Sequence, residues 1–130
     1  MTRIGGELYA WSDTEAKRCV EQFETVAELD EPYLPYEFNT LRVVRHKPSG
    51  RMFWAQSSGC SCPTPFEEFF IEVEGENIVA TDMNEITDAT WDEFEREAQD
   101  FCSTASTYLT PIAADERSAF FAAVKAARKP

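Results

Sequence analysis

The chain has 130 residues, of which 43% are hydrophobic and 13% aromatic, so it can bury a core and we expect one folded domain over residues 1–130. Its net charge of −12 disfavours nucleic acid as a partner, because phosphates would be repelled at long range. No apolar run approaches the roughly 18 residues of a membrane span, and the N-terminus lacks the apolar stretch of a signal peptide. We therefore expect a cytosolic protein without membrane association.

The charge is distributed unevenly along the chain. Residues 66–100 contain 13 acidic residues and one base, Arg96, so this segment carries the whole net charge. A cationic stretch precedes it, in which no acidic residue interrupts the basic side chains and the histidine: Arg42, Arg45, His46, Lys47 and Arg51. The sequence thus predicts a molecule whose negative and positive charges are unevenly distributed.

The first helix is predicted from Ser12 to the residue before Pro32. Ser12 and Glu15 form a capping-box pattern, and Pro32 cannot continue a helix. Apolar residues recur at helical spacing between these limits, at Ala16, Cys19, Val20, Phe23 and Ala27. Cys19 falls on the core stripe of this predicted helix.

Two β-hairpins are predicted in the middle of the chain. Strands at 40–46 and 51–56 flank the turn 47–50, where Pro48 and Gly50 suit a four-residue connection. The charged residues of these strands do not alternate cleanly with the apolar ones, so the pattern does not tell which face is buried. A second hairpin is predicted from runs at 69–73 and 78–81. Such short connections require antiparallel pairing.

Two more helices are predicted near the C-terminus. Thr90 and Glu93 form a capping box that opens a helix to about Cys102, and a last helix is expected over 112–127 after a Ser/Thr-rich linker at 103–111. The first of these helices has an apolar stripe of Trp91, Phe94, Ala98, Phe101 and Cys102. The expected fold is α+β, with a small antiparallel sheet of three to four strands packed against about three helices.

The segment Ser58-Gly59-Cys60-Ser61-Cys62-Pro63 offers a candidate zinc site. Cys60, Cys62 and His46 could supply three ligands, and Cys19 or Cys102 a fourth. The single residue between Cys60 and Cys62 is shorter than the two to four residues of common zinc knuckles, and a cysteine on a core stripe is usually a small hydrophobe. A loop shaped by glycine and proline, without any cofactor, is the competing interpretation.

The same thiols could serve chemistry instead of metal binding. Cys60 or Cys62 could be a nucleophile activated by His46 and the cationic stretch, or the two thiols could respond to oxidation. No sequence motif supports a thiol-dependent enzyme, and no third orienting group is apparent. We expect no catalytic residues.

Acidic residues form the candidate partner-binding surface. On the helix after Thr90, three acids follow one another at spacings of four and three residues, so they share one face. Such a face could bind a basic protein, or it could be an ordinary solvated helix surface. The predicted partner-binding residues are Glu67, Glu68, Glu93, Glu97 and Asp100.

Two segments carry a family resemblance: Arg45-His46-Lys47-Pro48-Ser49-Gly50-Arg51-Met52-Phe53-Trp54-Ala55 and Ser58-Gly59-Cys60-Ser61-Cys62-Pro63-Thr64-Pro65-Phe66-Glu67. Together with the stretch 90–95 and the Ala-rich C-terminal helix, they resemble a family of small uncharacterised proteins of actinobacteriophages. The resemblance transfers no catalytic residue. It implies a phage-encoded protein that acts in the host cytoplasm.

That origin favours a non-enzymatic module that binds or inhibits a basic host or defence protein, by analogy with other small acidic phage proteins. The alternatives are a module stabilised by zinc and a thiol-dependent enzyme.

Overall fold

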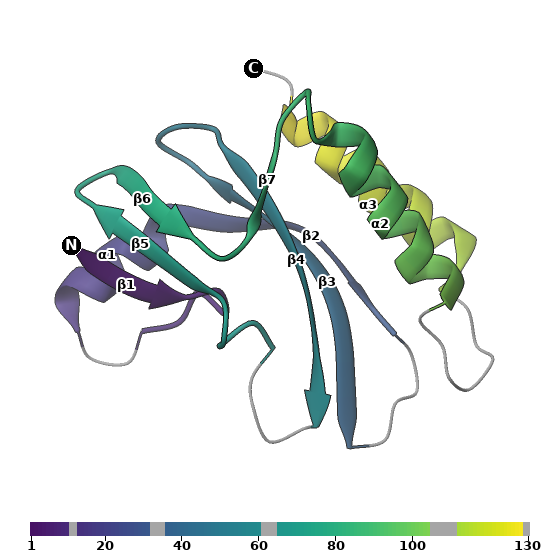
Figure 1. Cartoon of the computed structure of the whole chain (residues 1–130), viewed down its shortest axis with the longest axis horizontal. Coiled ribbons are helices and arrows are strands. Elements are labelled where there is room, and N and C mark those ends of the chain that lie inside the picture. Colours follow the sequence, from purple (N-terminus) through teal and green to yellow (C-terminus); the bar gives the residue numbers. More distant parts are fainter. Residues whose placement is uncertain (11–12, 32–35, 61–64, 105–111, 129–130) are drawn as a thin grey trace.

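The computed structural model describes residues 1–10, 13–31, 36–60, 65–104 and 112–128, and within these ranges it forms two antiparallel sheets and three helices (Figure 1). The α+β class and the antiparallel pairing are confirmed, with the strands divided between two sheets. The smaller sheet has the order β1-β5-β6 and the larger one β2-β3-β4-β7. The elements are β1 (Thr2–Gly5), α1 (Thr14–Glu21), β2 (Phe23–Asp30), β3 (Glu37–His46), β4 (Met52–Cys60), β5 (Phe70–Glu74), β6 (Asn77–Thr81), β7 (Asn84–Ile86), α2 (Trp91–Thr104) and α3 (Ala114–Arg128).

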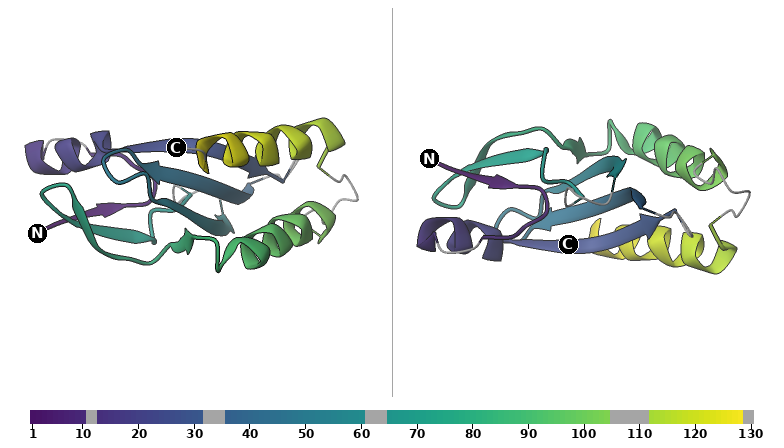
Figure 2. Two further views of the ribbon diagram at one scale, coloured as in Figure 1. Left: turned by 90° about the horizontal axis from the view of Figure 1, so that it is seen from above. Right: turned by 90° about the horizontal axis from the view of Figure 1, so that it is seen from below.

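The four-stranded sheet is the middle layer of the molecule. Helices α2 and α3 cover one of its faces, and the three-stranded sheet with α1 lies against the other (Figures 1 and 2). The long β3–β4 hairpin runs through the centre of this arrangement, with an unbroken register from Arg45 opposite Met52 to Glu37 opposite Cys60. Both predicted hairpins are confirmed.

Both faces of the β3–β4 hairpin are buried, which explains why its charged residues do not alternate cleanly with apolar ones. Val43 and Trp54 contribute to the cluster beneath the two helices, whereas Val44 and Phe53 contribute to the cluster beneath the smaller sheet. Successive side chains of a strand point to opposite faces. Neighbouring residues of one hairpin therefore fill two different cores.

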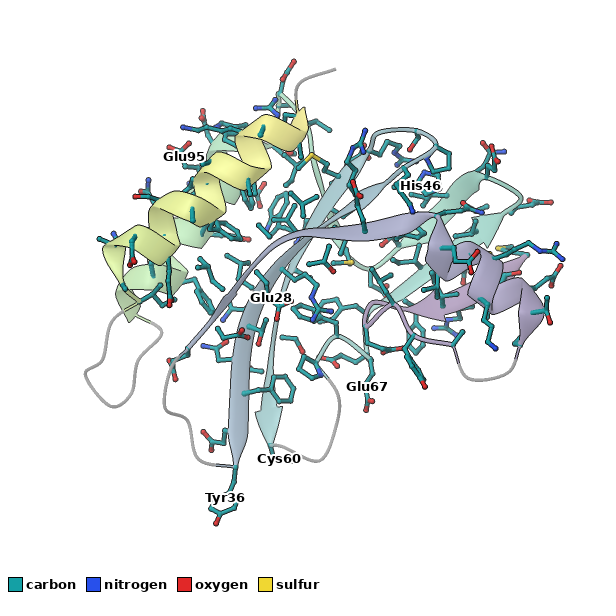
Figure 3. All side chains as sticks on the ribbon, turned by 180° about the vertical axis from the view of Figure 1, so that it is seen from behind. Glu28, Tyr36, His46, Cys60, Glu67 and Glu95 are labelled. Carbon is teal, nitrogen blue, oxygen red and sulfur yellow. The ribbon has the colours of Figure 1, made fainter. Side chains whose placement is uncertain are left out.

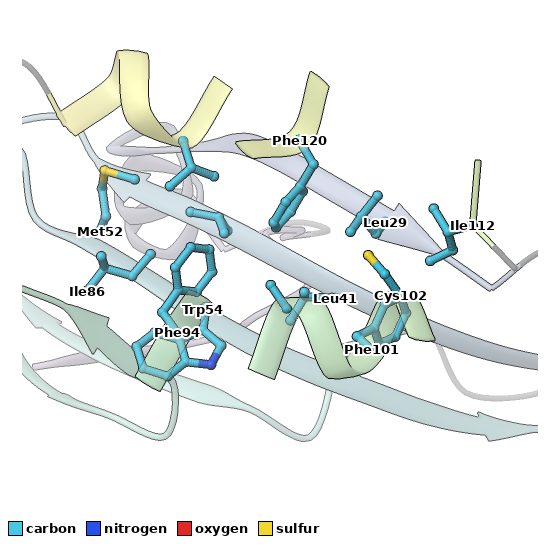
Figure 4. Close-up of a cluster of buried hydrophobic side chains, with 13 residues drawn as sticks. Leu29, Leu41, Met52, Trp54, Ile86, Phe94, Phe101, Cys102, Ile112 and Phe120 are labelled. Carbon is cyan, nitrogen blue, oxygen red and sulfur yellow. The ribbon is translucent and has the colours of Figure 1, made fainter. Parts of the chain in front are cut away.

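The core beneath the helices is built around Phe94 of α2 (Figure 4). Its ring lies 5.4 Å from Trp54 of β4 and 6.2 Å from Phe120 of α3, measured between ring centroids. Phe94 is fully buried, and burying such a ring contributes about 1.5–3 kcal/mol relative to leaving it exposed. This aromatic contact joins both helices to the sheet.

The first predicted helix is correct only in its N-terminal half. Helix α1 ends at Glu21, and the following residues from Phe23 to Asp30 form strand β2, which pairs with β3. Asp13 caps α1 by accepting from the backbone N–H groups of Glu15 and Ala16, whereas the expected cap Ser12 lies outside the described residues. Cys19 is buried as expected, but Phe23 and Ala27 belong to a strand.

The two C-terminal helices are confirmed, with α2 beginning at Trp91 and α3 at Ala114. The Thr90 hydroxyl donates to the carbonyl of Glu85 and accepts from the N–H of Thr87, so it joins the start of α2 to the end of β7. Most of the predicted linker 103–111 lies outside the described residues. Within the part of the chain that the structure describes, no helix has the length and apolar character needed to cross a membrane.

Candidate partner-binding site

The three arginines of the cationic stretch are paired with acids of neighbouring strands. Arg42 pairs with Glu28 at 2.7 Å and Arg45 with Glu24 at 3.1 Å, both acids lying on β2. On the other side, Arg51 makes a bidentate pair with Glu85 of β7, at 2.9 and 3.1 Å.

The Arg51–Glu85 pair also changes the proton affinity of its two members. Its hydrogen bonds lower the pKa of the Glu85 carboxyl and raise that of the Arg51 guanidinium. The three arginines thus connect the hairpin to both flanking strands of the sheet.

Arg42 also anchors the segment that precedes β5. Its guanidinium lies over the ring of Phe66, 4.4 Å from the centroid, and its Nη1 donates to the Gly6 carbonyl at 3.4 Å. The backbone of Gly6 runs so close that a Cβ there would lie 3.0 Å from the Phe66 carbonyl oxygen. Only glycine fits at this position without displacing the segment around Phe66.

His46 is a buried structural residue at the turn end of the hairpin, with both ring nitrogens engaged. Nδ1 lies 2.7 Å from Ser49 Oγ, and Nε2 lies 2.8 Å from Gln22 Oε1. Ser49 Oγ also accepts from the N–H of Arg51, and Gln22 donates its amide N–H to the Gly75 carbonyl. This pattern fits a neutral imidazole that donates from Nε2 and accepts at Nδ1.

Burial is the main reason why the pKa of His46 is lowered, and the nearby positive charge of Arg51 adds to the effect. Phe23 packs on the imidazole at 4.9 Å between ring centroids. The histidine thus links the hairpin turn, the end of α1 and the β5–β6 turn in its neutral form.

The proposed zinc ligands are not brought together. Cys60 ends β4 opposite Glu37, at the open end of the hairpin, whereas His46 lies at the turn end (Figure 3). The nine residue-to-residue steps of β3 from Glu37 to His46 span about 30 Å at about 3.3 Å per residue. Across the described ranges, no group of three or more His, Cys, Asp or Glu side chains is placed to hold a metal ion. Cys62 lies outside these ranges.

The remaining cysteines pack as hydrophobic side chains. Cys19 belongs to the core beneath the smaller sheet and Cys102 to the core beneath the helices. Burial raises the pKa of the Cys102 thiol, which keeps it protonated. Cys60 is exposed, but His46 is too far away to act as its base, so the proposed pairing of a Cys60 nucleophile with this histidine is not formed.

The predicted partner-binding acids are exposed, and Glu97 and Glu68 form side-chain hydrogen bonds with residues of β4. Glu97 Oε2 accepts from the indole N–H of Trp54 at 2.5 Å, and Glu68 Oε1 accepts from the hydroxyl of Ser57 at 2.8 Å. Both contacts reach β4, one on each face of the sheet. Glu93 and Asp100 are also exposed on α2, and Glu67 is exposed in the segment before β5.

An open groove of about 490 Å³ runs between α2 and the distal half of β4. Glu97 and Asp100 line its helical side, and Phe101 and Phe69 provide apolar surface. The sheet contributes three side-chain amides and one small residue, namely Asn39, Gln56, Asn84 and Ala55. The carboxylates and amides offer several hydrogen-bond acceptors, which suits a cationic group with many donors.

Sequence reasoning found the groove carboxylates but not the amides. No local pattern distinguishes Asn39, Gln56 and Asn84 from other polar strand residues, because their proximity depends on how β3, β4 and β7 pair. The strand lengths that leave part of β4 without a partner, nine residues for β4 and three for β7, are known only from the structure.

The surroundings of Glu7 show that negative charge accumulates near the open end. Burial is the largest cause of the raised pKa of its carboxyl, and the charges of Glu67 and Glu68 raise it further, against an opposing effect from Arg42. Two of the predicted partner-binding acids thus already act on a third carboxyl nearby. A cation brought to this region would relieve that repulsion.

The fold and the groove define an acidic α+β domain with a two-faced central sheet. A family model described as a domain of unknown function, DUF7574, matches residues 20–110, and the chain belongs to this family. The match includes the β3–β4 hairpin and α2, which form most of the groove. No curated protein and no solved structure matches the chain.

Proposed function

We propose that this chain is a phage-encoded, non-enzymatic interaction module that binds or inhibits a host or defence protein with a basic surface, in the cytoplasm of the bacterial host. The observation that carries the proposal is the open groove between α2 and β4, whose helical side is lined by Glu97 and Asp100. The arginines of the hairpin are paired with acids of β2 and β7, whereas the groove presents carboxylates and side-chain amides beside β4.

Electrostatics supports a basic protein as the partner. Complementary charge speeds association and suppresses wrong partners, and a net charge of −12 adds a long-range attraction for any cationic surface. The phage origin rests on the resemblance of the hairpin and the segment 58–67, and the host cytoplasm follows from that origin.

The experiment is a pull-down from the lysate of a bacterial host, with the purified chain as bait and salt raised from about 50 to about 500 mM. We expect a specific partner that is released as salt increases. The acidic-face variant Glu93→Gln, Glu97→Gln, Asp100→Asn should weaken its binding by about tenfold or more, because rim charges and buried charges both contribute to such contacts.

A matched control removes three charges elsewhere. Glu21→Gln, Glu74→Gln, Glu76→Gln changes the net charge equally at exposed positions of α1 and the β5–β6 hairpin. This control should retain the partner. Equal loss in both variants would mean that only overall charge matters, and no loss in either would contradict an acidic binding face.

A further inference from the structure

The distal half of β4 has no strand partner on its outer side among the described residues. Strand β7 pairs only with Met52, Phe53 and Trp54, although β4 continues to Cys60. An unpaired strand edge is a template for another strand.

The hairpin register shows which backbone groups point to this edge. The N–H of His46 bonds the carbonyl of Arg51, and bonded and non-bonded pairs alternate along an antiparallel ladder. With the unbroken register of β3 and β4, Ala55 and Ser57 direct their backbone groups towards β3. Gln56 and Ser58 direct theirs outward.

The outward backbone groups lie beside the acidic groove. Gln56 is exposed and lines the groove together with Glu97, Asp100 and Phe69. In Figure 1, this part of β4 has β3 on one side and the segment before β5 on the other. A residue placed opposite Gln56 on an added strand would project its side chain to the same face as Gln56, which is the face that the groove occupies.

From these observations we infer that the partner adds an extended segment to the outer edge of β4, hydrogen-bonding the backbone of Gln56 and Ser58. A lysine or arginine opposite Gln56 then lies in the groove against Glu97 and Asp100. This inference rests on the proposed function and names the form in which the basic partner binds. Main-chain bonds give affinity in such complexes, and the side-chain pocket gives specificity.

Charge argues for a basic segment and against a second copy of the chain. Pairing of β4 with the β4 of another copy would bring the two sets of groove carboxylates together, between molecules that each carry −12. Like charges placed face to face cost several kcal/mol at an interface.

The other edge of the large sheet is less suited to strand addition. Strand β2 has a bulge between Thr25 and Ala27, and bulges are one of the devices that protect edges from pairing. Helix α3 also packs alongside β2, where Phe120 and Ala123 line a second groove.

The test selects random displayed peptides on the immobilised chain and resynthesises the enriched ones with N-methyl groups on alternate residues. Each enriched peptide should contain lysine or arginine. Methylation of the residues that face β4 should reduce affinity about tenfold or more, because it removes the donors, whereas methylation of the intervening residues should change it less than about twofold.

Two further readouts locate the peptide on the protein. Binding should slow hydrogen exchange of the Gln56 and Ser58 amides, while the Ser57 amide, already directed at β3, should change little. The variant Glu97→Gln, Asp100→Asn should lose about tenfold in affinity for the same peptide, and Glu74→Gln, Glu76→Gln should not.

The possible failures separate this inference from the proposed function. Peptides that need the groove acids but are indifferent to the methylation pattern would overturn strand addition and leave an acidic binding face. If no peptide is enriched although the lysate partner is still captured, strand addition would also be overturned and the acidic binding face would remain. If affinity responds neither to peptide methylation nor to the groove-acid variant, both strand addition and the acidic binding face would be overturned. If the Gln56 and Ser58 amides are protected only in a concentration-dependent dimer, a second copy of the chain would be the occupant and the inference of a basic partner segment would be overturned.

Discussion

The turn end of the β3–β4 hairpin and the groove beside strand β4 use charge in different ways. At the turn end, Arg45 and Arg51 are paired with acids of the flanking strands, and the neutral His46 is buried among hydrogen bonds. In the groove between α2 and β4, Glu97 and Asp100 lie beside a strand edge. A run of charges in the sequence therefore reveals a binding surface only once the pairing of its neighbours is known.

Removal of His46 should give the largest effect, by disrupting the turn end. The variant His46→Ala leaves Gln22 and Ser49 without their partner and opens a cavity beside Phe23, so we expect a loss of about 2–4 kcal/mol in the free energy of unfolding. Urea denaturation measures it. Lys47→Ala, in the exposed turn, should stay within about 0.5 kcal/mol. Similar values for both variants would show that the histidine network does not hold this end.

Truncation of Glu97, which lines the groove, should cost less. Glu97→Ala leaves the buried indole N–H of Trp54 without an acceptor, for which we expect about 1–2 kcal/mol. Glu97→Gln keeps an acceptor and should be nearly neutral, as should Glu93→Ala on the exposed face of α2. If Glu97→Ala were as stable as Glu93→Ala, the contact with Trp54 would contribute nothing.

Acidification should affect the turn end through His46. Because the folded state lowers the pKa of His46, the unfolded chain takes up this proton more readily, and stability falls as pH drops below the ordinary histidine value of about 6.5. His46→Gln should lose less stability than the wild type over the same pH range, since the carboxylates common to both proteins cancel in the comparison. Parallel pH profiles would contradict a neutral buried imidazole.

Zinc should have the smallest effect. Since Cys60 and His46 lie at opposite ends of the hairpin, one equivalent of zinc should leave the thermal midpoint unchanged, and EDTA should not lower that of protein purified without chelator. Elemental analysis of the same sample provides the direct measurement. Stoichiometric zinc with melting sensitive to EDTA would mean that other ligands assemble around the Cys60 loop.

Local patterns were sufficient to predict the two hairpins and the two C-terminal helices, but not β2. Phe23 and Ala27 continue the helical spacing of Cys19, while the strand alternation of the same segment is interrupted by the bulge at Val26. Residues 23–30 form a strand and not a helix because they pair with the second edge of β3. Tertiary pairing thus overrides the local helical period.

The acidic residues of the candidate site could be predicted, but the groove could not. Glu97 and Asp100 are evident from their helical spacing, whereas Gln56 lies about forty residues earlier and meets them only through the way α2 packs on the sheet. The zinc hypothesis grouped His46 with Cys60, and the structure places these two residues at opposite ends of the hairpin. A histidine close to cysteines in sequence lay a full strand length from Cys60 in space.

The apolar character of both hairpin faces leaves the strand alignment exposed to slippage. If both strands of the hairpin shifted by one residue relative to the rest of the fold, Val43 and Val44 would exchange cores, and so would Trp54 and Phe53. All four side chains are hydrophobic, so hydrophobic burial alone would change little. The polar contacts would not survive it: His46 would leave Gln22, Arg42 would leave Glu28, and Trp54 would leave Glu97. The polar contacts of these three side chains therefore determine the strand register, which hydrophobic burial alone does not.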